Sequence, residues 1–300
     1  MNLFLPEKLG TLPLSNHLLR SGVPEGLALK SGAPHARLDE HYLQLIEGQA
    51  STIICGPISV TATSQPGLLS LHSIHQLASY RRLTDAVHEK GGLILARLSY
   101  PAAQQENPGE AYWRLLRSAE RSFSHAAAKA KEAGFDGIQL DFTFYSLPGC
   151  FLSRRYNQRE DEYGGEIHAR IRFPRDLYRA ARQAVGPDYP VWVCLETDVN
   201  LISVQDLLTS GQYLASAGVS AIEVCGDFPP PPPAPGHIGL PKQLHPAEML
   251  SRIVPVPVVM TAGLNTSLEM MQSAGRSKIR FFGLNHQLEE DPAFITRMIR

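Results

Sequence analysis

The sequence predicts an α/β fold in which eight parallel strands close into a (β/α)8 TIM barrel, made of a single domain. Short apolar runs alternate with longer segments of helical periodicity, and a chain of 300 residues accommodates eight such units. This alternation implies right-handed crossovers and a parallel sheet buried on both faces. An open doubly wound sheet is the alternative, but no Gly-x-Gly-x-x-Gly follows the first strand.

The expected strands are short and rich in β-branched or aromatic residues, and after the first each follows a helix-like segment that ends at glycine or a turn signal. The first strand is HLLRSG (17–22). The other seven expected strands, each given with the helix-like segment before it, are STIICG (51–56) after LDEHYLQLIEGQ, GLILARLSY (92–100) after HQLASYRRLTDAVHEKG, GIQLD (137–141) after RLLRSAERSFSHAAAKAKEAG, VWVCLE (191–196) after RIRFPRDLYRAARQAVG, AIEVCG (221–226) after VQDLLTSGQYLASAG, VPVVMTAG (256–263) after PAEMLSRI, and IRFFG (279–283) after TSLEMMQSAG. The third helical segment is the clearest, because Ala, Lys and Glu favour a helix and Gly134 closes it.

No domain boundary is visible between residues 1 and 300. The low-complexity segment PPPPPAPG (229–236) follows the sixth strand, where a barrel carries functional loops. Its polyproline character indicates a stiff wall or lid edge, or a simple spacer.

Composition excludes several classes of function. The formal net charge is −1 and no run of five like charges occurs, so neither nucleic acid nor an anionic membrane is an expected partner. The four cysteines are far apart, which favours reduced core thiols, and the histidines lack metal-ligand spacing, so we expect no metal. Without a leader or a long apolar run, the chain is expected to be cytoplasmic, and an oligomer is possible.

A charged segment after the fourth expected strand resembles a family signature. Its residues, in order, are Phe151, Leu152, Ser153, Arg155, Asn157, Arg159, Asp161, Tyr163, Gly164 and Gly165. In these positions the chain resembles the old yellow enzymes, barrel-shaped FMN oxidoreductases that reduce activated alkenes with NAD(P)H. LFLPEKLGTLPLSN likewise resembles that family's amino-terminal hairpin, expected at about residues 1–16. The arginines and acids of the signature also suit a loop held by internal ion pairs, which serves as scaffold with or without catalysis.

The resemblance implies FMN contacts that can be compared position by position. Arg97 stands where a glutamine bonds the flavin, and Cys194 stands where an arginine on strand 5 stabilises the reduced flavin. Asp141 and Phe144 replace the pair that binds the substrate carbonyl, and a flavin-tuning threonine falls at about Pro24. The phosphate site corresponds to Ala262, Gly263, Gly283 and Leu284.

Removal of one charge-assisted hydrogen bond costs about 1.5–3 kcal/mol, so the sequence predicts no cofactor and a vestigial phosphate site at Gly263 and Gly283. Two alternatives stay open. Backbone amides of these glycines can hold a phosphate, and Arg97 can donate to a flavin in place of glutamine.

Ionisable side chains gather at the carboxyl ends of the expected strands, the usual catalytic edge of this fold. The candidate catalytic residues are Asp141, Glu196, Arg97 and Tyr100. In the expected reaction, the carboxylate of Asp141 or Glu196 takes a proton from the carbon next to a substrate carbonyl, and Arg97 or Tyr100 stabilises the resulting enolate. The candidate pocket residues are Phe144, Tyr145, Cys194, Glu223 and Cys225. A structural role is the alternative for each, for example Asp141 paired with Arg97 as a buried ion pair.

Three functions follow as hypotheses. The first is a cofactor-independent, non-redox isomerase, epimerase or cyclase that acts on an enolisable, largely apolar metabolite of polyketide type in natural product biosynthesis. The second is an FMN-dependent NAD(P)H ene-reductase, which the overall resemblance favours. The third is a non-catalytic protein that binds a small molecule. The fold does not choose among them.

Overall fold

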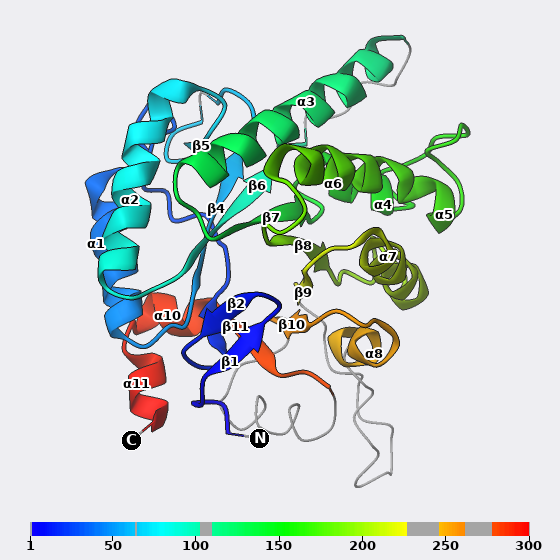
Figure 1. The fold of residues 1–300 in the computed structure, drawn as a ribbon. Coiled ribbons are helices and arrows are strands. Elements are labelled where there is room, and N and C mark those ends of the chain that lie inside the picture. Colours follow the sequence, from blue (N-terminus) through cyan, green and yellow to red (C-terminus); the bar gives the residue numbers. More distant parts are fainter. Residues whose placement is uncertain (1, 64, 103–109, 227–245, 262–277, 300) are drawn as a thin grey trace, which may run out of the picture.

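Eight of the strands form one closed parallel barrel in the computed structural model, which describes residues 2–63, 65–102, 110–226, 246–261 and 278–299 (Figure 1). The barrel order is β3, β4, β6, β7, β8, β9, β10, β11, and pairing of Arg20 with Ile53 closes it between β3 and β4. The strands of the chain are β1 (Glu7–Leu9), β2 (Leu12–Leu14), β3 (Leu18–Arg20), β4 (Ile53–Ser59), β5 (Leu69–Ser70), β6 (Ile94–Ser99), β7 (Gly137–Phe142), β8 (Val191–Glu196), β9 (Ala221–Cys225), β10 (Val258–Met260) and β11 (Phe281–Leu284). The predicted barrel is therefore confirmed, with each of its strands within the expected run or within three residues of it.

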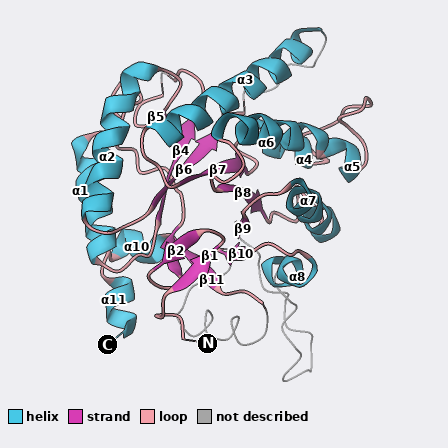
Figure 2. Ribbon diagram, viewed as in Figure 1, coloured by secondary structure: helices cyan, strands magenta, loops and turns pink. Residues whose placement is uncertain are grey.

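Helices surround the barrel, as Figure 2 shows by colour. They are α1 (Ala36–Glu47), α2 (Leu77–Glu89), α3 (Glu110–Glu132), α4 (Leu147–Leu152), α5 (Ile167–Arg170), α6 (Arg172–Val185), α7 (Val204–Ala217), α8 (Pro246–Ile253), α10 (His286–Glu290) and α11 (Phe294–Ile299), with a 3-10 turn at Ile74–Gln76. Helix α7 shows how the sequence sets both ends. The Ser203 hydroxyl accepts a hydrogen bond from the Asp206 N–H, and Gly218 ends the helix at a φ of 97°, a conformation that glycine adopts without strain.

The barrel interior changes from apolar to polar along the strands. At the amino end, the hairpin β1–β2 packs its leucines against Leu19, Leu95, Trp192 and Phe281, which point inward from four strands. Two residues further along the same strands stand Ser21, Arg97, Cys194 and Gly283, because side chains alternate between the two faces of a strand. The apolar layer and the hairpin close one end of the barrel, and the polar layer leads to the other.

The signature segment is a scaffold between β7 and α6. The Asn157 side chain donates to the carbonyls of Phe151 and Tyr163 at 2.8 and 2.7 Å, and Arg159 pairs with Asp161. These contacts agree with the internally braced loop expected from the sequence.

Helix α5 is tied to the same segment by Arg170. This wholly buried arginine donates to the Leu152 carbonyl and binds Asp206 of α7 at 2.7 Å. Arg170 therefore connects the end of α4 to α5 and α7.

Several expectations lie outside the part of the chain that the structure describes. These are the proline-rich loop at 229–236, Ala262 and Gly263 of the expected phosphate site, and the expected helical segment TSLEMMQSAG at 266–275. Among the described residues, no helix is both long and apolar enough to cross a membrane. All four cysteines are described and none forms a disulfide.

Candidate functional site

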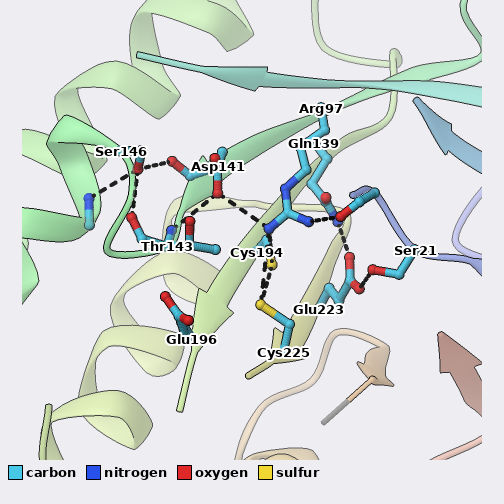
Figure 3. A network of polar contacts seen from close by, with 12 residues as sticks. Ser21, Arg97, Gln139, Asp141, Thr143, Ser146, Cys194, Glu196, Glu223 and Cys225 are labelled. Carbon is cyan, nitrogen blue, oxygen red and sulfur yellow. Dashed lines mark hydrogen bonds and ion pairs between the residues drawn. The ribbon is translucent and has the colours of Figure 1, made fainter. Parts of the chain in front are cut away.

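Arg97 is the centre of a buried polar network at the carboxyl ends of the strands (Figure 3). Its guanidinium donates to the Gly22 carbonyl at 2.8 Å, to Asp141 at 3.3 Å and to the Cys194 sulfur at 2.9 Å. Burial alone would lower the pKa of Arg97, but Cys194 and Asp141 outweigh it and hold the pKa well above its ordinary value. The site therefore holds a permanent, nearly solvent-free positive charge.

Gly22 leaves the room that this arginine needs. A Cβ at Gly22 would lie 2.9 Å from the Arg97 Cδ and 3.0 Å from the Gly56 carbonyl oxygen. A side chain here would displace the guanidinium or the loop after β3, so the position of the charge depends on this glycine.

Asp141 anchors the turn that follows β7 as well as the arginine. One carboxylate oxygen accepts from the Thr143 N–H at 3.2 Å, and the Asp141 carbonyl accepts from the Ser146 hydroxyl at 2.6 Å. Ser146 also accepts from Gly149, at the start of α4. Asp141 is 3% exposed, and its carboxylate contacts Arg97 and this turn. This arrangement matches the alternative in which Asp141 and Arg97 form a buried ion pair.

Glu196 lies at the end of β8 and is held by one contact from the neighbouring loop, a hydrogen bond of 2.9 Å from the Phe144 N–H. The pKa of Glu196 is raised, chiefly because burial disfavours the carboxylate, and the Phe144 N–H acts in the opposite direction. This carboxyl is the better candidate of the two acids for moving a proton.

Glu223 lies deeper in the barrel and has three donors from other strands. The hydroxyl of Ser21 donates to it, Gln139 donates at 2.6 Å and Thr261 at 2.6 Å. It is completely buried. These contacts join β3, β7 and β10 across the interior, so Glu223 is a cross-brace beneath the site.

Sequence reasoning missed the three partners of Glu223. Gln139 was recognisable, because it lies two residues before Asp141 on the same strand and so points to the same face. Ser21 and Thr261 come from strands far apart in the sequence, and only barrel closure brings them together.

The two sulfurs nearest the guanidinium are in contact. Cys194 Sγ and Cys225 Sγ lie 3.1 Å apart on the adjacent strands β8 and β9. Arg97 is 2.9 Å from the first and 4.0 Å from the second. Cys194 is fully buried, whereas Cys225 is partly exposed.

The remaining expected site residues differ in exposure. Tyr100 is half-buried, which raises the pKa of its phenol, and Phe144 is buried. Tyr145 is 82% exposed, so its side chain lies outside the buried network. Gly283 lies so close to Thr261 that a Cβ there would overlap its hydroxyl. The structure thus brings Arg97, Asp141, Cys194, Glu223 and Cys225 together, with Glu196 beside them.

Comparison with known proteins agrees with the fold and shows similarity to one family of flavin enzymes. The profile of the NADH:flavin oxidoreductase / NADH oxidase family matches residues 116–225. The chain is 26% identical to an NADH oxidase of Thermoanaerobacter brockii over 97% of this chain and 50% of that protein, and 28% identical to a metal reductase of Desulforamulus reducens over 97% and 47%. It therefore spans about half the length of these relatives. The fold matches an old yellow enzyme homologue from Zymomonas mobilis with a TM-score of 0.82, 20% identity, and coverage of 100% and 92%.

These findings overturn the expectation that the chain has no cofactor, because the matching family is one of flavin enzymes. The expectation compared this chain with the family one position at a time. In the structure, Arg97 of β6 places its guanidinium 2.9 Å from Cys194 of β8, so a cation lies beside the position at which the resemblance implies an arginine. Loss of flavin binding is not shown, and no comparison supports an isomerase, epimerase or cyclase.

Proposed function

We propose that this chain, residues 116–225 of which match the NADH:flavin oxidoreductase / NADH oxidase family, is an FMN-dependent oxidoreductase that takes electrons from NADH or NADPH and passes them to a small organic acceptor. The observation that carries the proposal is the buried Arg97 guanidinium at the carboxyl end of the barrel. That edge is where enzymes of this fold bind their ligands.

The residues described at the site fit a flavin in charge and in hydrogen-bonding capacity. The Arg97 Nε is buried and has no hydrogen-bond partner among the described residues, so a donor is left over in the site. The pyrimidine edge of a flavin carries carbonyl and ring-nitrogen acceptors, and it becomes negative on reduction. A fixed cation in a water-poor site favours such an acceptor strongly.

The bound FMN would supply the hydride chemistry that no amino-acid side chain performs. The protein's own groups then have separate tasks. Arg97 would orient the ring edge and stabilise negative charge, while Asp141 and the Gly22 carbonyl hold the guanidinium in place. Glu196, whose raised pKa keeps a proton at higher pH, would deliver that proton to the acceptor.

The test is flavin binding by the purified full chain. We expect a yellow protein with the visible spectrum of bound flavin, or an apoprotein that quenches the fluorescence of added FMN on titration. Arg97→Gln removes the charge and should weaken FMN binding about ten- to a hundred-fold, the equivalent of one charge-assisted hydrogen bond.

A matched control is Arg81→Gln, which removes an arginine from an exposed ion pair with Glu132 and should leave FMN affinity unchanged. An apoprotein that neither retains nor quenches FMN at millimolar concentration would refute the proposal. Equal affinity of wild type and Arg97→Gln would refute the role given to the arginine.

A further inference from the structure

The thiols of Cys194 and Cys225 form a pair at the carboxyl end of the barrel that flavin chemistry does not use. They are on adjacent strands, and their sulfurs are 3.1 Å apart. Both side chains point inward, because Cys194 is paired in register with Glu223 and Cys225 with Glu196, all on the same face. We propose that Cys194 and Cys225 are a dithiol centre that reduces low-molecular-mass disulfides by thiol–disulfide exchange.

The different exposure of the two cysteine residues assigns their order of attack. Cys225 is the last residue of β9 and is partly exposed, so a small disulfide reaches it first. Cys194 is wholly buried below it, and its sulfur contacts the sulfur of Cys225 and the Arg97 guanidinium. Burial first of all, and then the hydrogen bond to Cys225, raise the pKa of Cys194, which suits a thiol that attacks second.

The Arg97 guanidinium lies beside both sulfurs. It lies 2.9 Å from Cys194 Sγ and 4.0 Å from Cys225 Sγ. A neighbouring cation favours the thiolate over the thiol, and the thiolate is the nucleophile in exchange. The other two cysteines have different surroundings: Cys150 donates to the Phe144 carbonyl at 3.4 Å, and Cys55 is completely buried.

The exchange balances without a further oxidant. The Cys225 sulfur attacks one sulfur of the disulfide R–S–S–R, a bond forms between Cys225 and R–S, and the first R–S⁻ leaves and takes up the proton that Cys225 gave up. The Cys194 sulfur then attacks Cys225 Sγ, and the second R–S⁻ leaves with the Cys194 proton. The two cysteines lose two electrons as a disulfide forms, and R–S–S–R becomes two R–SH. An external dithiol restores the pair.

Closure of the pair requires a small movement. Disulfide sulfurs are about 2.05 Å apart, so the two atoms must approach by about 1 Å. Cys225 ends β9, and Gly226 with a φ of 95° follows it, so the chain direction changes at the residue that has to move. Oxidation should therefore also loosen the contact of Cys194 with Arg97.

The test equilibrates the full chain with defined ratios of glutathione disulfide to glutathione, followed by acid quenching, alkylation and peptide mass spectrometry. We expect the number of alkylated cysteines to fall from four to two, with Cys194 and Cys225 linked, and dithiothreitol should restore all four. Cys194→Ser should accumulate a stable mixed disulfide with glutathione at Cys225. Cys225→Ser should leave Cys194 unmodified.

Cys55→Ser and Cys150→Ser are the matched controls and should behave as wild type. Circular dichroism checks folding, and Cys194→Ala replaces Cys194→Ser if the latter unfolds. Failure of the 194–225 link at every ratio, absence of the Cys225 adduct in both Cys194 variants, or equal oxidation of Cys55 and Cys150 would each overturn the proposal. The exchange needs no flavin, so it is measured on FMN-free protein, and its outcome is independent of the flavin titration.

Discussion

The buried ion pair of Arg97 and Asp141 offers a quantitative test of how this site is held together. The two side chains are 6% and 4% exposed, and their closest atoms are 3.3 Å apart. On the surface, Arg81 and Glu132 are closer, at 2.8 Å, but 51% and 53% exposed. Distance alone would make the surface pair the stronger one. Solvent screening reverses the order, because water competes with an exposed pair and is excluded from a buried one.

The experiment is a pair of double-mutant cycles. Arg97→Met leaves the Asp141 carboxylate buried without its cation and should lower the free energy of unfolding by about 3–5 kcal/mol. The double variant with Asp141→Asn should be much less destabilised than the sum of the single variants, giving a coupling energy of about 2–3 kcal/mol. The surface cycle with Arg81→Met and Glu132→Gln should give about 0.2–1 kcal/mol.

The assay is urea denaturation followed by circular dichroism at pH 7 on FMN-free protein, so that ligand binding does not enter the cycle. If the buried cycle gives a coupling no larger than the surface cycle, the carboxylate is stabilised by the Thr143 N–H and the turn rather than by the arginine. The network around Arg97 would then be a set of independent contacts.

Three further predictions concern other parts of the chain. Burial raises the pKa of Glu25 from 4.5 to about 7, so between these pH values the folded protein holds a proton that the unfolded chain releases. The free energy of unfolding should therefore fall by up to about 3 kcal/mol as the pH rises from 4.5 to 7. Glu25→Gln should flatten this pH dependence in thermal melts. Gly149→Ala would place a Cβ 1.9 Å from the Thr143 carbonyl oxygen and should lower the free energy of unfolding in urea by more than about 2 kcal/mol. Gly165→Ala meets no neighbouring atom but is strained at a φ of 71°, so it should lower this free energy by about 1 kcal/mol. Equal losses in the two variants would contradict the close contact at Gly149. If Glu196 delivers the proton, turnover should fall as pH rises through its raised pKa, and Glu196→Gln should be slow and free of that pH dependence; a variant with the wild-type profile would exclude this role.

The fold was predictable from the sequence because each strand is a short apolar run that ends in a turn, and this local pattern is repeated eight times. GIQLD and VWVCLE, for example, are β7 and β8 almost to the residue. The alternation of faces within a strand was equally local, so Arg97, Asp141 and Cys194 could be expected at one end of the barrel. The contact of Arg97 with Asp141 needed only adjacent strands, whereas its contact with Cys194 spans β7.

Other features of the site depend on distances that a linear pattern does not contain. Glu223 was expected in the pocket, but its three donors from β3, β7 and β10 make it part of the interior. The cofactor prediction failed for a related reason. It asked whether each position kept its family residue, whereas Arg97 reaches from β6 to β8 and brings a charge to a position where the family arginine is absent.

The apolar layer and hairpin at the amino end have a consequence for engineering. Leu19, Leu95 and Trp192 stabilise the fold on the side of the barrel interior that the hairpin β1–β2 covers. A library that varies only inward-facing positions two residues further along the strands would therefore change specificity while it spares the packing that the barrel needs in order to fold. Exposed Lys8 on the hairpin is a suitable point for a dye or a surface tether, because it lies at the end of the barrel opposite to the site.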